Sequence, residues 1–128
     1  MARKHLPAMS PSETEVLRIV WLSGKATVQE VCDKLPRSRR IAYATVQTLL
    51  RRLEAKGYLT HETRGKAHVF APAISREKVI RRTVGDFVER LFGGDPVPLM
   101  LHLAEQAELN DEDVRHLRRL VAGQDEKS

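Results

Sequence analysis

The residues best suited to binding chemistry lie on one face of a helix predicted over residues 42–57. Four apolar residues at i, i+3, i+4 and i+7 predict its buried side: Val46, Leu49, Leu50 and Leu53. The opposite side carries small, amide, hydroxyl and cationic side chains: Ala44, Gln47, Thr48, Arg51 and Arg52. Such a face suits a DNA major groove, because small residues allow close approach, Gln can pair with adenine, and Arg can bond guanine or phosphate. A solvated helix face can have the same composition, so the neighbouring elements must decide.

Two shorter helices are predicted before this one, and each begins with a capping box, in which a Ser or Thr and a Glu satisfy two backbone donors reciprocally. The first box spans residues 10–13, and Gly24 ends that helix. The second box spans residues 27–30, and Pro36 ends that helix. The two apolar stripes are Val16, Leu17, Val20 and Trp21, and Val28, Val31, Cys32 and Leu35. Cys32 is expected in the core and not as a reactive thiol, because its helical face offers no fixed basic neighbour.

A basic hairpin is predicted after the helix at 42–57. Gly57 fits the left-handed position that follows a helix, and residues 58–63 and 67–71 are short β-branched or aromatic runs. Between them, Arg64-Gly65-Lys66 forms a cationic tip, and a basic turn at 37–40 precedes the helix. Three helices followed by a basic hairpin are the order of a winged helix-turn-helix domain. The alternative is a small α+β domain with a positively charged surface.

Charge is distributed unevenly along the 128 residues, whose net charge is +5. Residues 1–72 carry 13 Lys/Arg against 6 Asp/Glu (net +7), whereas residues 73–128 carry 9 against 11 (net −2). The basic part favours a polyanionic partner. No apolar run approaches the ~20 residues that span a bilayer, and the N-terminus has no signal-peptide pattern, so we expect no membrane insertion and a cytoplasmic location.

The C-terminal part is predicted to form three amphipathic helices. Ser75 can cap the first, an apolar segment follows Pro98, and Asn110 can cap the last, whose acidic start and basic end suit the helix dipole. Helices of this size bury too little alone, so they must pack on the rest of the chain or on another subunit. The change of charge at Ala73 favours packing on another subunit, so we expect a homodimer. The residues predicted at the dimer interface are Ile80, Val84, Phe87, Val88, Leu91, Leu101, Leu117 and Leu120.

Catalysis and metal binding are not indicated by the polar residues. Four histidines, His61, His68, His102 and His116, lack the spacing of an HExxH motif or a CxxC companion. Solvent-facing or core positions explain them better. The chain has no glycine-rich phosphate loop and no Ser-His-Asp signature. We therefore expect no enzyme activity, no catalytic residue, no bound metal and no cofactor.

Taken together, the motifs resemble the penicillinase-repressor family, which includes the BlaI and MecI proteins and the copper-responsive CopY branch. The resemblance is carried by the Ser-x-x-Glu start and Trp21, the helix at 42–53, Lys56-Gly57 and the stretch at 65–72. It runs over nearly the whole chain and is strongest over residues 10–72. It implies a mainly α fold with a small β-hairpin wing, divided into a winged helix-turn-helix DNA-binding domain at 1–73 and a helical dimerisation domain at 74–128.

By this resemblance, the chain is expected to be a transcriptional repressor that binds a double-stranded, inverted-repeat DNA operator as a dimer. The residues predicted to contact DNA are Arg39, Arg40, Tyr43, Ala44, Thr45, Gln47, Thr48, Arg51, Arg52, Arg64 and Lys66. In the antibiotic-responsive branch, a membrane sensor and protease pathway cuts the dimerisation region, and the corresponding bond here is His102-Leu103. The copper branch ends in a cysteine cluster that residues 124–128 lack, so a copper switch is not expected. The alternatives are a winged-helix regulator released by a small ligand or protein partner, and a winged-helix protein that binds RNA or protein.

Overall fold

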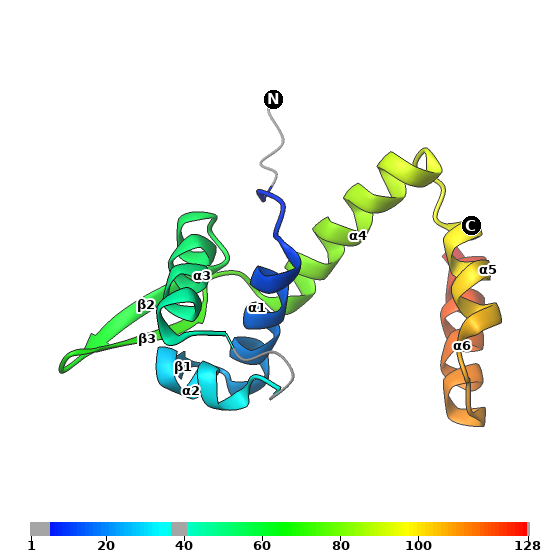
Figure 1. Ribbon diagram of the computed structural model, residues 1–128. Coiled ribbons are helices and arrows are strands. Elements are labelled where there is room, and N and C mark those ends of the chain that lie inside the picture. Colours follow the sequence, from blue (N-terminus) through cyan, green and yellow to red (C-terminus); the bar gives the residue numbers. More distant parts are fainter. Residues whose placement is uncertain (1–5, 37–40, 128) are drawn as a thin grey trace. The chain divides into compact units, whose positions relative to one another are not determined.

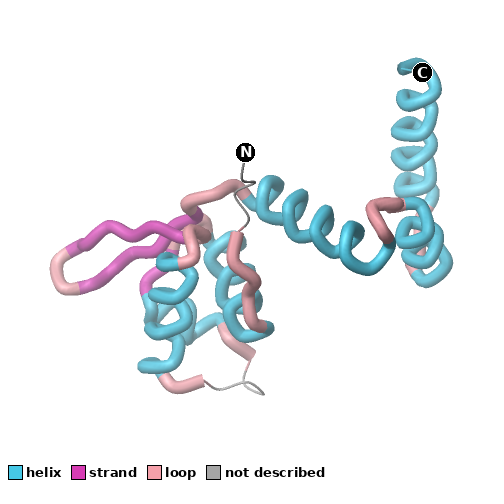
Figure 2. The backbone as a smooth tube through the Cα atoms, turned by 90° about the horizontal axis from the view of Figure 1, so that it is seen from above, coloured by secondary structure: helices cyan, strands magenta, loops and turns pink. Residues whose placement is uncertain are grey.

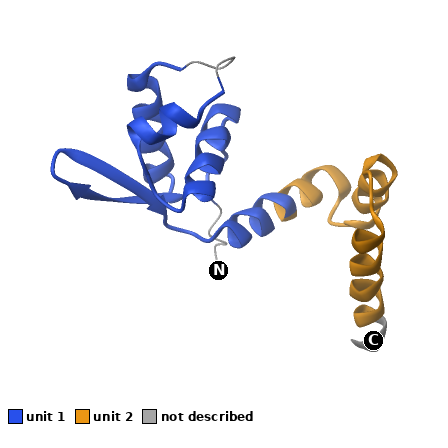
Figure 3. Ribbon diagram, turned by 90° about the horizontal axis from the view of Figure 1, so that it is seen from below, with its two compact units in different colours: residues 1–84 blue, residues 85–128 orange. Residues whose placement is uncertain are grey.

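The computed structural model describes residues 6–36 and 41–127 and divides the chain into two compact units, residues 1–84 and 85–128 (Figure 3). Unit 1 contains α1 (Pro11–Ser23), β1 (Ala26–Thr27), α2 (Val28–Lys34), α3 (Tyr43–Ala55), β2 (Leu59–Arg64), β3 (Ala67–Pro72) and the first part of α4 (Arg76–Phe92). Unit 2 contains the rest of α4, α5 (Val97–Gln106) and α6 (Asp111–Lys127) (Figure 1). The predicted fold class, mainly helical with a small antiparallel sheet, is confirmed.

Both predicted capping boxes are present at the starts of α1 and α2. Ser10 Oγ accepts from the Glu13 backbone N–H at 3.1 Å, and Glu13 Oε1 accepts from the Ser10 N–H at 2.8 Å. Thr27 and Glu30 form the same reciprocal pair at 3.2 and 2.9 Å. These bonds satisfy backbone donors that a helix start leaves free, so the chain enters both helices at defined residues.

The sheet has three antiparallel strands in the order β1-β3-β2 (Figure 2). The hairpin of β2 and β3 was predicted, but β1 was not. Ala26 pairs with Phe70 and Thr27 pairs with Val69. A strand of two residues is too short to show an alternating pattern, and Thr27 is also the N-cap of α2. Through β1, the base of the wing is joined to the helices.

The core of unit 1 fixes the orientation of α3. All four residues of the predicted α3 stripe are buried, with exposures of 0 to 5%. They pack with residues of α1, α2 and the sheet, of which the largest fully buried are Phe70, Leu17, Val16, Val20 and Val31. Each fully buried leucine contributes about 1.5 to 3 kcal/mol through the hydrophobic effect. Because this face is held in the core, the opposite face of α3 must point away from the domain.

A partly buried ion pair joins the start of α1 to the end of α3. Lys56 Nζ lies 2.7 Å from Glu13 Oε1 and donates a second bond, of 2.8 Å, to the Ala8 carbonyl. Burial raises the pKa of the Glu13 carboxyl, but hydrogen bonds from Lys56 and Ser10 outweigh burial, so the pKa lies below its usual value. The Tyr58 hydroxyl also donates to the Pro7 carbonyl at 2.6 Å. The segment before α1 is thereby tied to the end of α3.

Unit 2 exposes most of its apolar side chains. The large apolar residues that are at least 41% exposed there are Phe87, Leu91, Val97, Met100, Leu101, Leu103, Leu109, Leu117, Leu120 and Val121. Asn110 caps α6 as predicted, because its Oδ1 accepts from the Asp113 N–H at 2.8 Å. Ser75 likewise caps α4 through the Lys78 N–H at 3.2 Å. These helices therefore begin at defined residues, but most apolar side chains of unit 2 are not covered by other residues of the chain.

Candidate nucleic-acid interface

The outer face of α3 is accessible over its whole length. Ala44, Thr45, Thr48, Arg51 and Arg52 are exposed. Gln47 is half-buried at one edge of this face, and Tyr43 is 51% exposed at its start. The DNA contacts predicted on α3 therefore lie together on one surface. Arg39 and Arg40, predicted in the preceding turn, lie outside the described residues.

Thr48 can act toward a ligand mainly as an acceptor. Its hydroxyl donates to the Ala44 carbonyl one turn earlier, at 3.0 Å. The donor of this side chain is thereby used inside the helix, and its lone pairs remain available. In a major groove, those lone pairs match the amino groups of adenine or cytosine.

The first turn of α3 is electropositive. Ala42 is its N-cap and makes no side-chain capping bond, and the first turn contains no acidic residue. The free N–H groups and the helix dipole favour an anion at this end. A backbone phosphate is the anion that a duplex would present there.

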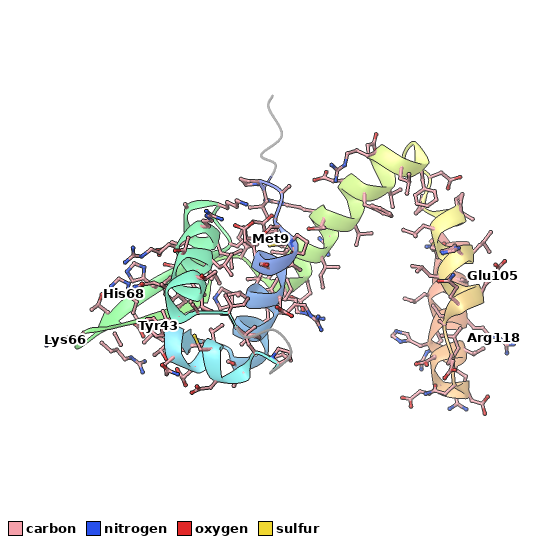
Figure 4. All side chains as sticks on the ribbon, viewed as in Figure 1. Met9, Tyr43, Lys66, His68, Glu105 and Arg118 are labelled. Atoms are coloured by element: carbon pink, nitrogen blue, oxygen red, sulfur yellow. The ribbon has the colours of Figure 1, made fainter. Side chains whose placement is uncertain are left out.

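A hollow of about 200 Å³ separates α3 from the start of α2 and the wing. Tyr43, Gln47 and Arg51 line it from α3, where they follow one another at intervals of four residues. The residues that line it from the other elements are Thr27, Val28, Gln29, Lys66, Ala67, His68 and Phe70. Figure 4 shows Lys66 at the tip of the hairpin, beyond His68. Amide, phenol, guanidinium and ammonium groups therefore surround one concave surface.

The two cations of the wing tip are not equivalent. Arg64 Nη2 lies 3.1 Å from Glu62 Oε1, so an acidic neighbour on the same strand offsets part of its charge. Both side chains of that pair are about 60% exposed, so the pair adds little stability. Gly65, at the tip, has φ of 60°, a left-handed conformation that glycine adopts without a Cβ penalty. Lys66 follows directly and has no acidic partner among the described residues.

A histidine pair connects α3 to the wing. His61 Nδ1 on β2 lies 2.6 Å from Glu54 Oε2 on α3. The ring of His68 on β3 stacks on His61, with centroids 4.3 Å apart and an angle of 13° between the planes. The Phe70 ring lies 5.5 Å from His61 and is buried. Both histidines are half-buried, and His68 also borders the hollow beside Gln47.

The residues predicted for dimerisation differ in exposure within the single chain. Val88 is 7% exposed and so is already buried, whereas Phe87 is 43% and Leu91 is 65% exposed. The other predicted interface residues are also exposed: Ile80, Val84, Leu101, Leu117 and Leu120. His102 and Leu103, at the predicted cleavage bond, are exposed within α5.

Over the described part of the chain, no group of three or more His, Cys, Asp or Glu side chains is arranged to hold a metal ion. No helix there is both long and apolar enough to cross a membrane.

Known proteins are similar to this chain in sequence and, over part of its length, in fold. The penicillinase repressor family matches residues 9–123. The penicillinase repressor of Bacillus licheniformis is 28% identical over 118 residues, which cover 92% of each chain. That of Staphylococcus aureus is 25% identical over 121 residues, covering 94% of this chain and 95% of its own. The solution structure of the DNA-binding domain of the repressor BlaI is 32% identical, covers 58% of this chain and 90% of its own, and superposes with a TM-score of 0.51. The chain belongs to the penicillinase repressor family.

Proposed function

We propose that the chain represses transcription as a homodimer, with α3 of each subunit in a major groove of an inverted-repeat operator. That the protein is a DNA-binding transcriptional repressor follows from its family. The observation that carries the finer proposal is the outer face of α3, which is exposed, small, polar and cationic beside a cationic wing tip.

In this proposal, the contacts divide into positioning and reading. Arg52, Arg64, Lys66 and the first turn of α3 bind phosphates, which fixes the register without reading sequence. Gln47 and Thr48 read base edges, and Ala44 allows the close approach that they need. The predicted contacts Tyr43, Thr45 and Arg51 flank them. The predicted contacts Arg39 and Arg40 precede α3 in the sequence and lie outside the described residues.

The apolar side chains of unit 2 support a dimer. Monomeric proteins rarely expose a large contiguous apolar surface, and helices α4, α5 and α6 expose many large apolar residues. We assign DNA binding to residues 1–73 and dimerisation to residues 74–128. Val88 contributes to packing within one chain, and Phe87, Leu91, Leu101, Leu117 and Leu120 contribute to the interface. Ile80 and Val84, also predicted at the interface, lie exposed in unit 1.

Release from DNA is proposed to follow a cut at His102-Leu103 by a membrane sensor and protease pathway. The bond lies on an exposed helix, so a turn of α5 must unwind before a protease can bind it. The cut would remove α6 and its apolar residues from the interface. Release by a small ligand or a protein partner is the alternative. No catalytic role is proposed, and since a repressor acts on the chromosome, its proposed location is the cytoplasm.

Selection of duplexes from genomic fragments, followed by footprinting, tests the proposal. The protected sites should be inverted repeats with half-sites centred ~34 Å apart, or a multiple of that distance, as for a dimer that places one helix in each of two major grooves on one side of the duplex. Equal protection of single half-sites by the full chain would contradict it.

A further inference from the structure

A groove of about 620 Å³ lies within unit 1, between α1 and the first part of α4. This volume is within the range of small-molecule sites, which are about 300 to 1,000 Å³. Its walls are mainly apolar, and the apolar side chains that line it are Met9, Trp21, Leu22, Val79, Ile80 and Val84. Leu22 is 84% exposed, so a large apolar side chain stands uncovered at its edge. Figure 4 shows Met9, one of these lining residues, beside the start of α1.

The polar side chains that line the groove are neutral or cationic: Thr14, Arg18, Arg76 and Thr83. No carboxylate is among the described residues of the lining. The Arg76 guanidinium carbon lies 5.8 Å from the centre of the Trp21 ring, a cation–π distance.

We propose that this groove binds a small amphipathic anion, with a hydrocarbon or aromatic body against the apolar wall and a carboxylate held by Arg18 and Arg76. Guanidinium groups bind carboxylates through paired hydrogen bonds, and the absence of acidic side chains from the lining leaves both arginines suited to that role. The proposal does not depend on how the protein contacts DNA.

The rival occupant is a second copy of the chain, because Ile80 and Val84 also belong to the predicted dimer stripe. A concave site with two guanidinium groups and no acidic residue among its described lining fits an anionic small molecule better than the apolar side of a partner helix. The two occupants predict different behaviour of Trp21.

Fluorescence of the full-length protein tests the proposal directly, because Trp21 is its only tryptophan. Titration with octanoate should change the Trp21 emission saturably, and 1-octanol, which lacks the charge, should bind more weakly. Arg18→Gln and Arg76→Gln should each weaken octanoate binding about tenfold, the loss of one charge-assisted hydrogen bond. Arg82→Gln, on α4 but outside the lining, is the matched control and should leave binding unchanged. Thr83→Phe, an exposed position in the lining, should block the groove while the fold is retained.

Three outcomes would overturn the proposal. The first is no saturable response to octanoate up to about 10 mM in protein that is folded by circular dichroism. The second is an equal effect of the Arg18, Arg76 and Arg82 substitutions. The third is a change of Trp21 emission on dilution that has the same midpoint as dimer dissociation measured by sedimentation, since that would assign the groove to the second copy.

Discussion

Replacing Lys56 by methionine should destabilise the protein strongly at neutral pH and much less in acid. The Glu13 side chain is 3% exposed and the Lys56 side chain 29%. The substitution keeps a similar apolar stem and removes the ammonium group 2.7 Å from Glu13 Oε1. Glu13 Oε2 already has no partner among the described residues, so the carboxylate would keep only its bonds to Ser10.

The magnitude follows from the burial of the pair. Removing one partner of a buried ion pair costs about 3 to 5 kcal/mol. Because Lys56 reaches solvent, water offsets part of that cost, and we expect a loss of about 2 to 4 kcal/mol at pH 7.5. The loss should appear as a shift of the urea midpoint with an unchanged slope.

The pH dependence separates charge from packing. In the parent, Glu13 has a lowered pKa, so its contribution to stability is present above its ordinary pKa of 4.5 and is lost as pH falls through the lowered value. In Lys56→Met, burial remains and the main lowering contact is gone, so the pKa of Glu13 should rise and a larger share of the carboxyl should be protonated in acid. The penalty at pH 4.5 should therefore be well below that at pH 7.5.

Glu13→Gln is the matched background for this experiment, because Gln keeps the capping-box bond and carries no charge. In that background, Lys56→Met still removes the bond to the Ala8 carbonyl but leaves no unpaired carboxylate, so it should cost clearly less than in the parent at pH 7.5. An equal cost in both backgrounds and at both pH values would refute the charge argument and assign the effect to packing.

Three further predictions concern the surface, the interface and the thiol. Lys66→Gln should weaken binding to operator and random DNA alike and lower the slope of log affinity against log salt concentration by about 0.9, whereas Arg64→Gln should have a smaller effect because Glu62 offsets its charge. Fluorescence anisotropy at several salt concentrations measures both effects, and a larger effect of Arg64→Gln would contradict the ion-pair argument. Phe87→Asp should sediment as a monomer and bind the operator at least ~100-fold more weakly, because linking two half-site contacts raises affinity about 10² to 10⁴-fold. A monomer that binds the operator as tightly as the parent would rule out dimer-linked binding. Cys32 should react with iodoacetamide at pH 7.5 far more slowly in the folded protein than in the urea-unfolded protein, because burial and, to a smaller extent, the negative charge of Asp33 raise the pKa of its thiol. Equal rates in the two states would show that the thiolate is accessible in the folded protein.

Local signals were sufficient for most of the helical framework. The capping boxes at Ser10 and Thr27 depend on residues three apart, and the stripe of α3 repeats within a single helix, so both can be recognised in a short window. The predicted helix at 42–57 is observed as Tyr43–Ala55, with Gly57 at φ of 92° just beyond it. For the same reason, the predicted outer face of α3 lies on one surface.

Features that depend on contacts between distant residues were not predicted. The pair of His61 with Glu54 requires the path of the chain from α3 into β2, and the stacking of His68 requires the register of the hairpin. The groove beside Trp21 requires the placement of α4 against α1, which Val79 secures by burial in the core of unit 1. The sequence also does not predict which side chains of one apolar stripe are covered: Phe87 is 43% exposed, whereas its neighbour Val88 is 7% exposed.

The most direct test of base reading by α3 is to measure the affinity of Gln47→Ala for the operator and for a shuffled duplex at 150 mM salt. If α3 reads bases, the substitution should cost ~1 to 3 kcal/mol on the operator, about 5- to 150-fold, and leave the shuffled duplex almost unchanged. Gln106→Ala, an exposed glutamine at the end of α5, is the matched control and should change neither. An equal loss on both duplexes, or none on the operator, would contradict base reading by α3.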